Sequence, residues 1–274
     1  MKKIEINDGN TNAVVMKDFG GVISSLVVDG VEILYMNESD LGVANLLAGG
    51  IPVLFPFCST TQDDTYIVNG KEYTMPMHGF VKDMSFSLEK QTNSSVTVYT
   101  VPNEIIKKEN YPFDFVLHIE YKVSGQSLLI NATIDNLSDT PMPYYIGWHT
   151  YFRTGSKKNT KFTFDFANYT SYLDGESGEV QGNTIDLSQP LDHVYKGIGD
   201  KRMLLENYAD GYNAQIVVDD LHEVLTVCTA FADCACIEPW TAVPDAINTG
   251  ELLRHVAPNS SVTCGWQINV QITK

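Results

Sequence analysis

The chain has 274 residues, 43% of them hydrophobic and 19% charged, and a formal net charge of −16. This length and composition are typical of a globular protein with a sizeable core, and we expect residues 1–274 to form a single domain. The acidic balance disfavours binding to nucleic acid or to an anionic membrane, because phosphate contacts need clustered lysine and arginine, so a neutral small molecule is the simplest partner.

The first ten residues, MKKIEINDGN, contain two lysines that no apolar stretch follows. This pattern does not predict a secretory signal. No apolar window in the chain approaches the length that spans a bilayer. We therefore expect a cytoplasmic protein.

Alternation of apolar and polar residues is the dominant pattern along the chain, as in half-buried strands. The alternating positions are rich in Val, Ile, Thr, Tyr and Phe, which fit a pleated surface. The runs are 94–101, 115–123, 127–135, 161–166, 214–218, 223–231 and 261–273. The pattern predicts an all-β fold of antiparallel strands in two packed sheets.

Turn-forming pairs separate these runs. They are Asp29-Gly30, Asn69-Gly70, Ser124-Gly125, Asp174-Gly175 and Asp210-Gly211. Asn69-Gly70 predicts a tight hairpin, because both central positions of that turn need a positive φ. The only helical prediction is a short turn over residues 103–110.

The chain has five cysteines, an odd number, and none lies in a paired CxxC pattern. We therefore predict no metal site. Cys234 and Cys236 alternate along an apolar run and should share one face of a strand. Buried, reduced core thiols are the interpretation that we favour.

Three stretches depart from the strand pattern. The first runs from Gly49-Gly50-Ile51-Pro52 to His78-Gly79-Phe80, and its glycines and prolines predict a backbone held on a fixed path near a ligand. The second, residues 142–152, surrounds His149 with tyrosine, tryptophan and phenylalanine. In the third, residues 234–248, Glu238 ends an apolar run and Pro239-Trp240 follow it.

Each stretch also has a structural explanation, because a histidine on an apolar face is commonly a hydrogen-bonded core residue and aromatic clusters commonly form cores. Glu238 is harder to explain in this way, since a buried carboxylate is costly unless it is paired or functional. A carboxylate with a raised pKa beside an imidazole makes an acid–base pair that works near neutral pH. Tyr151 and Trp240 would supply flat faces that suit a sugar ring. We interpret His118, His222 and His255 as structural.

Other reaction classes receive less support. The chain has no phosphate-binding glycine-rich loop and no GxSxG nucleophile motif. A second carboxylic acid placed for glycoside cleavage remains open, because aspartates are plentiful.

Five motifs, in this order, resemble the aldose 1-epimerase (galactose mutarotase) superfamily. They are GGIPVLFPF, HGF, WHTYF, LDHVY and CIEPW with PDAIN, and the resemblance that they carry spans residues 49–257. The resemblance implies an antiparallel β-supersandwich, a small-molecule sugar substrate, and interconversion of the α and β anomers of an aldose without a metal or other cofactor.

The resemblance also implies residue roles. His149 matches the general acid that protonates the ring oxygen, and Glu238 matches the general base that deprotonates the anomeric hydroxyl. His78 matches a histidine on the ring-oxygen side of the sugar, and Asp192 matches a carboxylate that holds sugar hydroxyls. Lys82 stands where the family commonly has an arginine, and we include it among the expected substrate contacts.

The chain departs from the family pattern after the FPFC segment, where Ser59-Thr60-Thr61 replace a common sugar-contacting arginine. The substrate identity is therefore open. A hexose-6-phosphate 1-epimerase is one alternative, favoured by Arg153 but disfavoured by the missing arginine and the acidic balance. A catalytically silent carbohydrate-binding protein on the same scaffold is another. Either a monomer or a homodimer is compatible with the sequence.

Overall fold

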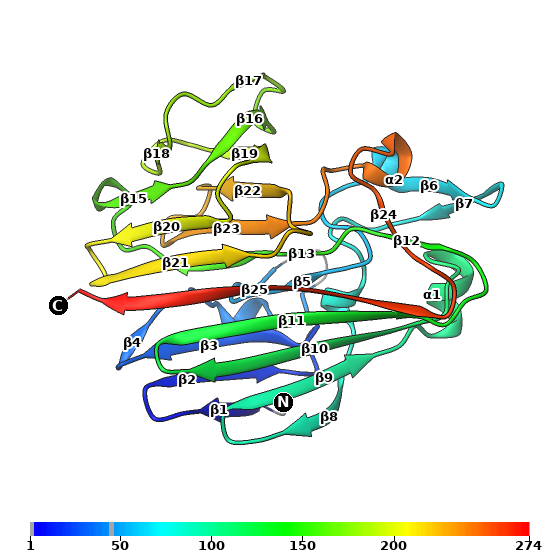
Figure 1. The fold of residues 1–274 in the computed structure, drawn as a ribbon, viewed down its shortest axis with the longest axis horizontal. Coiled ribbons are helices and arrows are strands. Elements are labelled where there is room, and N and C mark those ends of the chain that lie inside the picture. Colours follow the sequence, from blue (N-terminus) through cyan, green and yellow to red (C-terminus); the bar gives the residue numbers. More distant parts are fainter. Residues whose placement is uncertain (1–2, 44–46, 274) are drawn as a thin grey trace.

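The computed structural model describes residues 3–43 and 47–273. Antiparallel strands make up most of this part of the chain, arranged as two large sheets with smaller sheets beside them (Figure 1). The larger sheet has nine strands, in the spatial order β18 (Thr184–Asp186), β15 (Thr160–Thr163), β20 (Arg202–Asn207), β21 (Tyr212–Val218), β25 (Ser260–Ile272), β11 (Ser127–Asn136), β10 (Phe115–Ser124), β9 (Ser95–Thr100) and β8 (Ser87–Gln91).

The second large sheet carries the residues of the candidate site. Its order is β17 (Ser177–Glu179), β16 (Phe166–Ser171), β19 (Asp192–Ile198), β22 (Val224–Cys228), β23 (Cys234–Trp240), β13 (Gly147–Trp148) and β5 (Val53–Leu54), and β14 (Thr150–Arg153) also pairs with β23.

The small sheets and helices complete the described chain. The four-stranded sheet comprises β1 (Lys3–Asn7), β2 (Thr11–Met16), β3 (Val22–Val28) and β4 (Val31–Glu32), and the two-stranded sheets are β6 (Thr65–Val68) with β7 (Lys71–Thr74) and β12 (Met142–Tyr144) with β24 (Arg254–Val256). The α-helices are α1 (Glu104–Glu109) and α2 (Ala246–Thr249), and short 3-10 turns cover Glu38–Asp40, Gln62–Asp64, Val81–Asp83 and Lys157–Asn159.

The predicted all-β antiparallel fold is confirmed, and so are most of its predicted elements. Strands β9, β10, β11, β21 and β25 match their alternating runs to within two residues. The Asn69-Gly70 hairpin joins β6 to β7, with φ of 51° and 75° at its two central residues. Helix α1 begins after Asn103, whose side-chain oxygen accepts a hydrogen bond from the backbone N–H of Ile106.

Two predicted runs were too long. Run 161–166 is divided, because β15 ends at Thr163 and the chain crosses to β16 in the other large sheet. Phe162, Phe164 and Phe166 keep the alternation across this crossing because all three pack in the core. Run 223–231 ends early, since β22 stops at Cys228.

Buried side chains from both large sheets and from the four-stranded sheet form a continuous hydrophobic cluster that extends in sequence from Ile4 to Val270. All five cysteines are buried and reduced, as expected. Among the described residues, no helix has the length and apolar character needed to cross a bilayer.

Candidate active site

The register of four strands places the polar residues of the site in rows. Asp192 on β19 lies opposite Cys228 on β22, Cys228 lies opposite Cys236 on β23, and Cys236 lies opposite Tyr151 on β14. Residues directly opposite one another share a face of a sheet. The next row on that face, two residues along, pairs Thr226 with Glu238.

His149 lies between β13 and β14, both of which pair with β23. Gly147 opposes Trp240 and Thr150 opposes Ile237 in one continuous register, so His149 falls opposite Glu238. The backbone N–H of His149 donates to the carbonyl of Pro52 at 3.1 Å. The pairing of β13 and β14 with β23 explains why the WHTYF and CIEPW segments, which are far apart in sequence, meet.

The side chains of His149 and Glu238 are in contact. Nε2 of His149 lies 3.2 Å from Oε1 of Glu238, and their side chains are only 11% and 2% exposed. The ring of Tyr151 stacks on the His149 ring, with centroids 4.5 Å apart and an interplanar angle of 16°. Nδ1 of His149 and Oε2 of Glu238 are buried and have no hydrogen-bond partner in the described part of the chain.

Burial shifts the pKa values of this pair in opposite directions. It raises the pKa of Glu238 well above its usual value, with further increases from nearby Cys228 and Asp192. It lowers the pKa of His149 well below 6.5, helped by the neighbouring His78. Together these shifts favour one proton on the pair, carried by Glu238 while His149 is neutral.

His78 is held in a single orientation by backbone contacts. Nδ1 of the His78 ring accepts a hydrogen bond of 3.1 Å from the backbone N–H of Ser59. The backbone N–H of His78 donates to the carbonyl of Ser59 at 2.7 Å. Burial, with a smaller effect of the Lys82 charge, lowers the pKa of His78 to about 4. His78 is therefore neutral at pH 7, and because Nδ1 is the acceptor, its ring proton is on Nε2.

The glycine after His78 is needed for this loop. Gly79 has a φ of 72°, and a Cβ there would lie 2.2 Å from the carbonyl oxygen of Phe55. Phe55 belongs to the GGIPVLFPF segment, so the close approach of backbones joins the first two motifs. In this loop conformation, the ring centroid of His78 lies 5.5 Å from that of His149 and 6.3 Å from that of Trp240.

These residues surround a cavity of about 390 Å³, which we call the site cavity. Its two carboxyl groups are Glu238 and Asp192, and burial raises the pKa of Asp192. The rim includes Met77 and Phe231, which are 51% and 41% exposed. The residues that line the cavity are Ser59, Thr60, Met77, His78, His149, Tyr172, Asp192, Thr226, Cys228, Ala230, Phe231, Glu238 and Trp240.

The structure brings five of the seven expected site residues to the site cavity: His78, His149, Asp192, Glu238 and Trp240. Tyr151 does not line it, because Tyr151 is buried behind the His149 ring. In this position Tyr151 can hold the His149 ring in place by stacking, but it does not reach a ligand in the site cavity.

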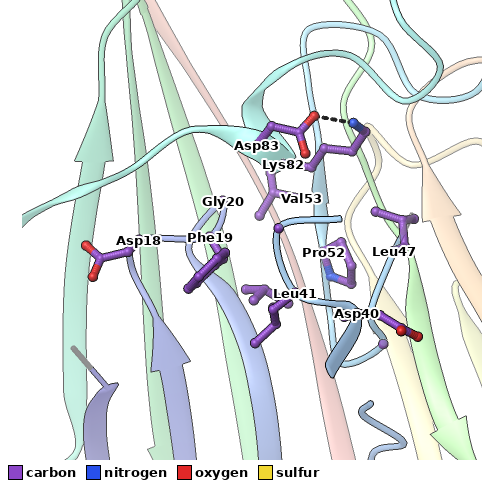
Figure 2. Close-up of a pocket in the computed structure, with 14 residues that line it drawn as sticks. Asp18, Phe19, Gly20, Asp40, Leu41, Leu47, Pro52, Val53, Lys82 and Asp83 are labelled. Atoms are coloured by element: carbon purple, nitrogen blue, oxygen red, sulfur yellow. Dashed lines mark hydrogen bonds and ion pairs between the residues drawn. The ribbon is translucent and has the colours of Figure 1, made fainter. Parts of the chain in front are cut away.

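Lys82 is also outside the site cavity. It lies in the 3-10 turn Val81–Asp83, where the chain has turned away from His78, and its ammonium pairs with Asp83. Figure 2 shows this pair beside a separate hollow of about 190 Å³, together with Phe19, Leu41 and Pro52. The expected contact of Lys82 with the substrate is therefore not supported, although its charge contributes to the lowered pKa of His78.

Several lining residues were missed from sequence. Tyr172 follows β16, and its hydroxyl lies 2.9 Å from Oγ of Ser59. Ser59 and Thr60 follow the FPFC segment, where the sequence showed only that the family's common arginine is absent. Cys228 and Thr226 lie opposite Cys236 and Glu238 in the register of β22 and β23. The composition of two strands does not reveal their register, so these two residues could not be identified from the sequence.

One group in the described chain combines several potential metal ligands. His149, Cys236 and Glu238 each bring a ligand atom to within 4.8 Å of the others. Zinc sites use these residue types. However, Cys236 is fully buried and does not line the site cavity, so we assign no metal ion to the group.

The model of a known protein family, described as aldose 1-epimerase, matches residues 2–263. The chain belongs to the aldose 1-epimerase family. Protein LacX (plasmid) of Lactococcus lactis subsp. lactis is 26% identical over 269 aligned positions, covering 88% of each chain.

Two solved structures share the fold of this chain. The Slr1438 protein from Synechocystis sp. PCC 6803 has a TM-score of 0.93 and 26% identity, covering 99% of this chain and 96% of its own. A galactose mutarotase related enzyme from Lactobacillus acidophilus has a TM-score of 0.85 and 21% identity, covering 100% and 98%. The predicted galactose mutarotase-like fold is thereby confirmed.

Proposed function

We propose that this member of the aldose 1-epimerase family is an isomerase that interconverts the α and β anomers of a free aldose. The observation that carries the proposal is the contact of 3.2 Å between His149 and Glu238 at the wall of a sugar-sized cavity. Family membership supports the same reaction class.

In the proposed reaction, Glu238 removes the proton from the anomeric hydroxyl while His149 delivers a proton to the ring oxygen. The ring C–O bond breaks, giving the open aldehyde, which rotates about C1–C2. Closure reverses the roles: Glu238 returns a proton to O1, and His149 takes one from O5. Opening and closure break and re-form one C–O bond and transfer two protons without a net change of oxidation state, so the reaction needs no oxidant or reductant.

The electrostatics of the site define the starting state of this sequence. Burial favours a protonated Glu238 beside a neutral His149 in the empty site, which is also the distribution after ring opening. Ring opening of a bound sugar therefore starts after the proton has moved from Glu238 to His149 across their 3.2 Å contact, and the opening step returns the pair to the distribution that burial favours.

The remaining residues suit sugar binding. His78 offers a fixed Nε2–H donor beside His149. Asp192 offers a carboxylate for sugar hydroxyls, and Trp240 offers an aromatic face for the apolar side of the ring. Tyr151, stacked on His149, serves as a positioning residue.

The lining of the site cavity favours an uncharged sugar over a sugar phosphate. No lysine or arginine is among its described lining residues, whereas Asp192 and Glu238 are. Arg153, which favoured a phosphorylated substrate from sequence, is exposed on β14 and does not line the cavity. A phosphate there would meet two carboxyl groups without a compensating cation.

NMR exchange spectroscopy of the anomeric protons tests the proposal over a panel of aldoses and their 6-phosphates. We expect the protein to accelerate α–β exchange of at least one free aldose. A panel in which no sugar exchanges faster than in buffer alone would refute the proposed function.

A further inference from the structure

Two thiols face each other across neighbouring strands beside the site cavity. Cys228 on β22 lies directly opposite Cys236 on β23. Both belong to one packed cluster with Tyr151 and Cys234. Directly opposite residues have Cβ atoms about 4.5–5.5 Å apart, and a disulfide needs about 3.5–4.5 Å, so a small side-chain movement would suffice for a bond.

Of the five cysteines, Cys228 alone lines the site cavity. It is 9% exposed, whereas the other four are at most 1% exposed. A hydrogen bond from the Cys236 thiol, the largest effect, lowers the pKa of Cys228 despite its partial burial. A small neutral oxidant that enters the cavity thus meets one thiol with enhanced thiolate character and a second thiol immediately behind it.

We propose that Cys228 is a site of reversible oxidation by hydrogen peroxide and that Cys236 is its resolving thiol. The Cys228 thiolate attacks one peroxide oxygen, the O–O bond breaks, and hydroxide leaves, giving a sulfenic acid. The Cys236 sulfur then attacks the Cys228 sulfur, and the S–O bond breaks. The departing hydroxide takes the Cys236 proton, and the first hydroxide takes the proton that Cys228 lost on ionising, so two thiols and one peroxide give one disulfide and two waters.

The topology selects Cys236 over Cys234 as the resolving thiol. Cys234 is two residues from Cys236 on the same strand, about 6.6 Å along it. The register between β22 and β23 ends at the Cys228–Cys236 pair, so Cys234 is not opposite any residue of β22. Bonding of Cys228 to Cys236 keeps the existing register, whereas a bond to Cys234 requires the strands to slide.

The same row connects the thiols to the sugar-binding residues. Asp192 is the partner of Cys228 on the other side, and Glu238 follows Cys236 on the same face of β23. The disulfide would draw the Cys228 sulfur toward Cys236 and alter the cavity wall between these carboxyl groups. We expect slower anomerisation after oxidation, a consequence that rests on the proposed function.

Peptide mapping of the folded full-length protein after hydrogen peroxide treatment tests the inference. We expect a Cys228–Cys236 crosslink that dithiothreitol reverses. In C236S, dimedone should label Cys228 as a sulfenic acid, and C228S should give neither product. C264S is the matched control, because Cys264 is buried in the nine-stranded sheet and away from the row. C264S should form the crosslink like the wild type.

Reduced, unmodified Cys228 in peroxide-treated wild-type protein would overturn the inference, as would a crosslink of Cys228 to Cys234. Loss of the crosslink in C264S would also contradict it. These outcomes are read from the masses of peptides and of their fragments, which separate Cys234 from Cys236, so they stand apart from any result on sugar turnover. Anomerisation that is equally fast before and after complete crosslinking would refute the expected effect on activity.

Discussion

Nε2 of His149 and Oε1 of Glu238 lie 3.2 Å apart because the two strands on either side of His149 continue a single register along β23. A backbone arrangement thus sets the distance between the two groups to which we assign the proton transfers.

The rate of anomerisation should have a bell-shaped dependence on pH. The active form carries one proton on the His149–Glu238 pair. Because the pKa of His149 is lowered, addition of a second proton, and loss of activity, should occur well below pH 6.5. Because the pKa of Glu238 is raised, loss of the single proton should occur well above pH 4.5. The pH profile of kcat/KM for a free aldose measures both limits, and a maximum confined to pH values below 4.5 would contradict the assignment.

Folding stability should fall as the pH is lowered from 6.5 toward 4, partly because of His78. The pKa of His78 falls to about 4 in the folded protein from its ordinary 6.5, so the unfolded chain binds more protons in this window. The contribution approaches about 1.4 kcal/mol per pH unit. His78→Asn should reduce the pH dependence of the free energy of unfolding, measured by urea denaturation at pH 7 and pH 5. Asparagine suits the positive φ of this position. An unchanged pH dependence in the variant would contradict the buried, neutral state of His78.

Gly147→Ala should impair the site through Trp240. A Cβ at Gly147 would lie 2.3 Å from Cδ1 of Trp240, so the indole must move. Overpacking of this kind typically costs about 1–3 kcal/mol. We expect a higher KM and lower stability, measured by steady-state kinetics and thermal unfolding. Trp240→Ala removes all three atoms that the added Cβ would meet, so the double variant should lose less stability than the sum of the losses in the two single variants. Losses that simply add would show that the clash lies elsewhere.

A free hexose should be preferred to its 6-phosphate, and the preference should weaken with added salt. The site cavity presents the carboxylate of Asp192 without a lining lysine or arginine among its described residues, so the phosphate is repelled. Salt screens this repulsion. Comparison of KM for glucose and glucose 6-phosphate across a salt series measures the effect. Tighter binding of the phosphate at low salt would instead favour the hexose-6-phosphate alternative.

The all-β fold was predictable because the alternating pattern directly reflects burial on one face of a strand. In β10 and β11, buried positions alternate almost without exception. The sheet change between β15 and β16 was not predictable, because Phe162, Phe164 and Phe166 continue the same alternation while the backbone changes partners.

The site was predictable where a residue conflicts with its surroundings. Glu238 in an apolar run and His149 among aromatic residues were conspicuous for this reason. Tyr172 and Cys228 carry no such local signal, since their places in the cavity depend on strand register and on a loop contact with Ser59. Lys82 was misplaced because its spacing from His78 does not reveal the turn at Val81–Asp83.

Polarimetry of a freshly dissolved α-aldose, with wild-type protein, Glu238→Gln and His149→Ala compared, tests the central claim most directly. We expect the wild type to accelerate the change in optical rotation and each variant to lose about 10²- to 10⁴-fold of the rate, because each lacks one partner of the acid–base pair. Sugar binding, measured by calorimetry, should persist in Glu238→Gln. Variants that are folded and as fast as the wild type would contradict the account.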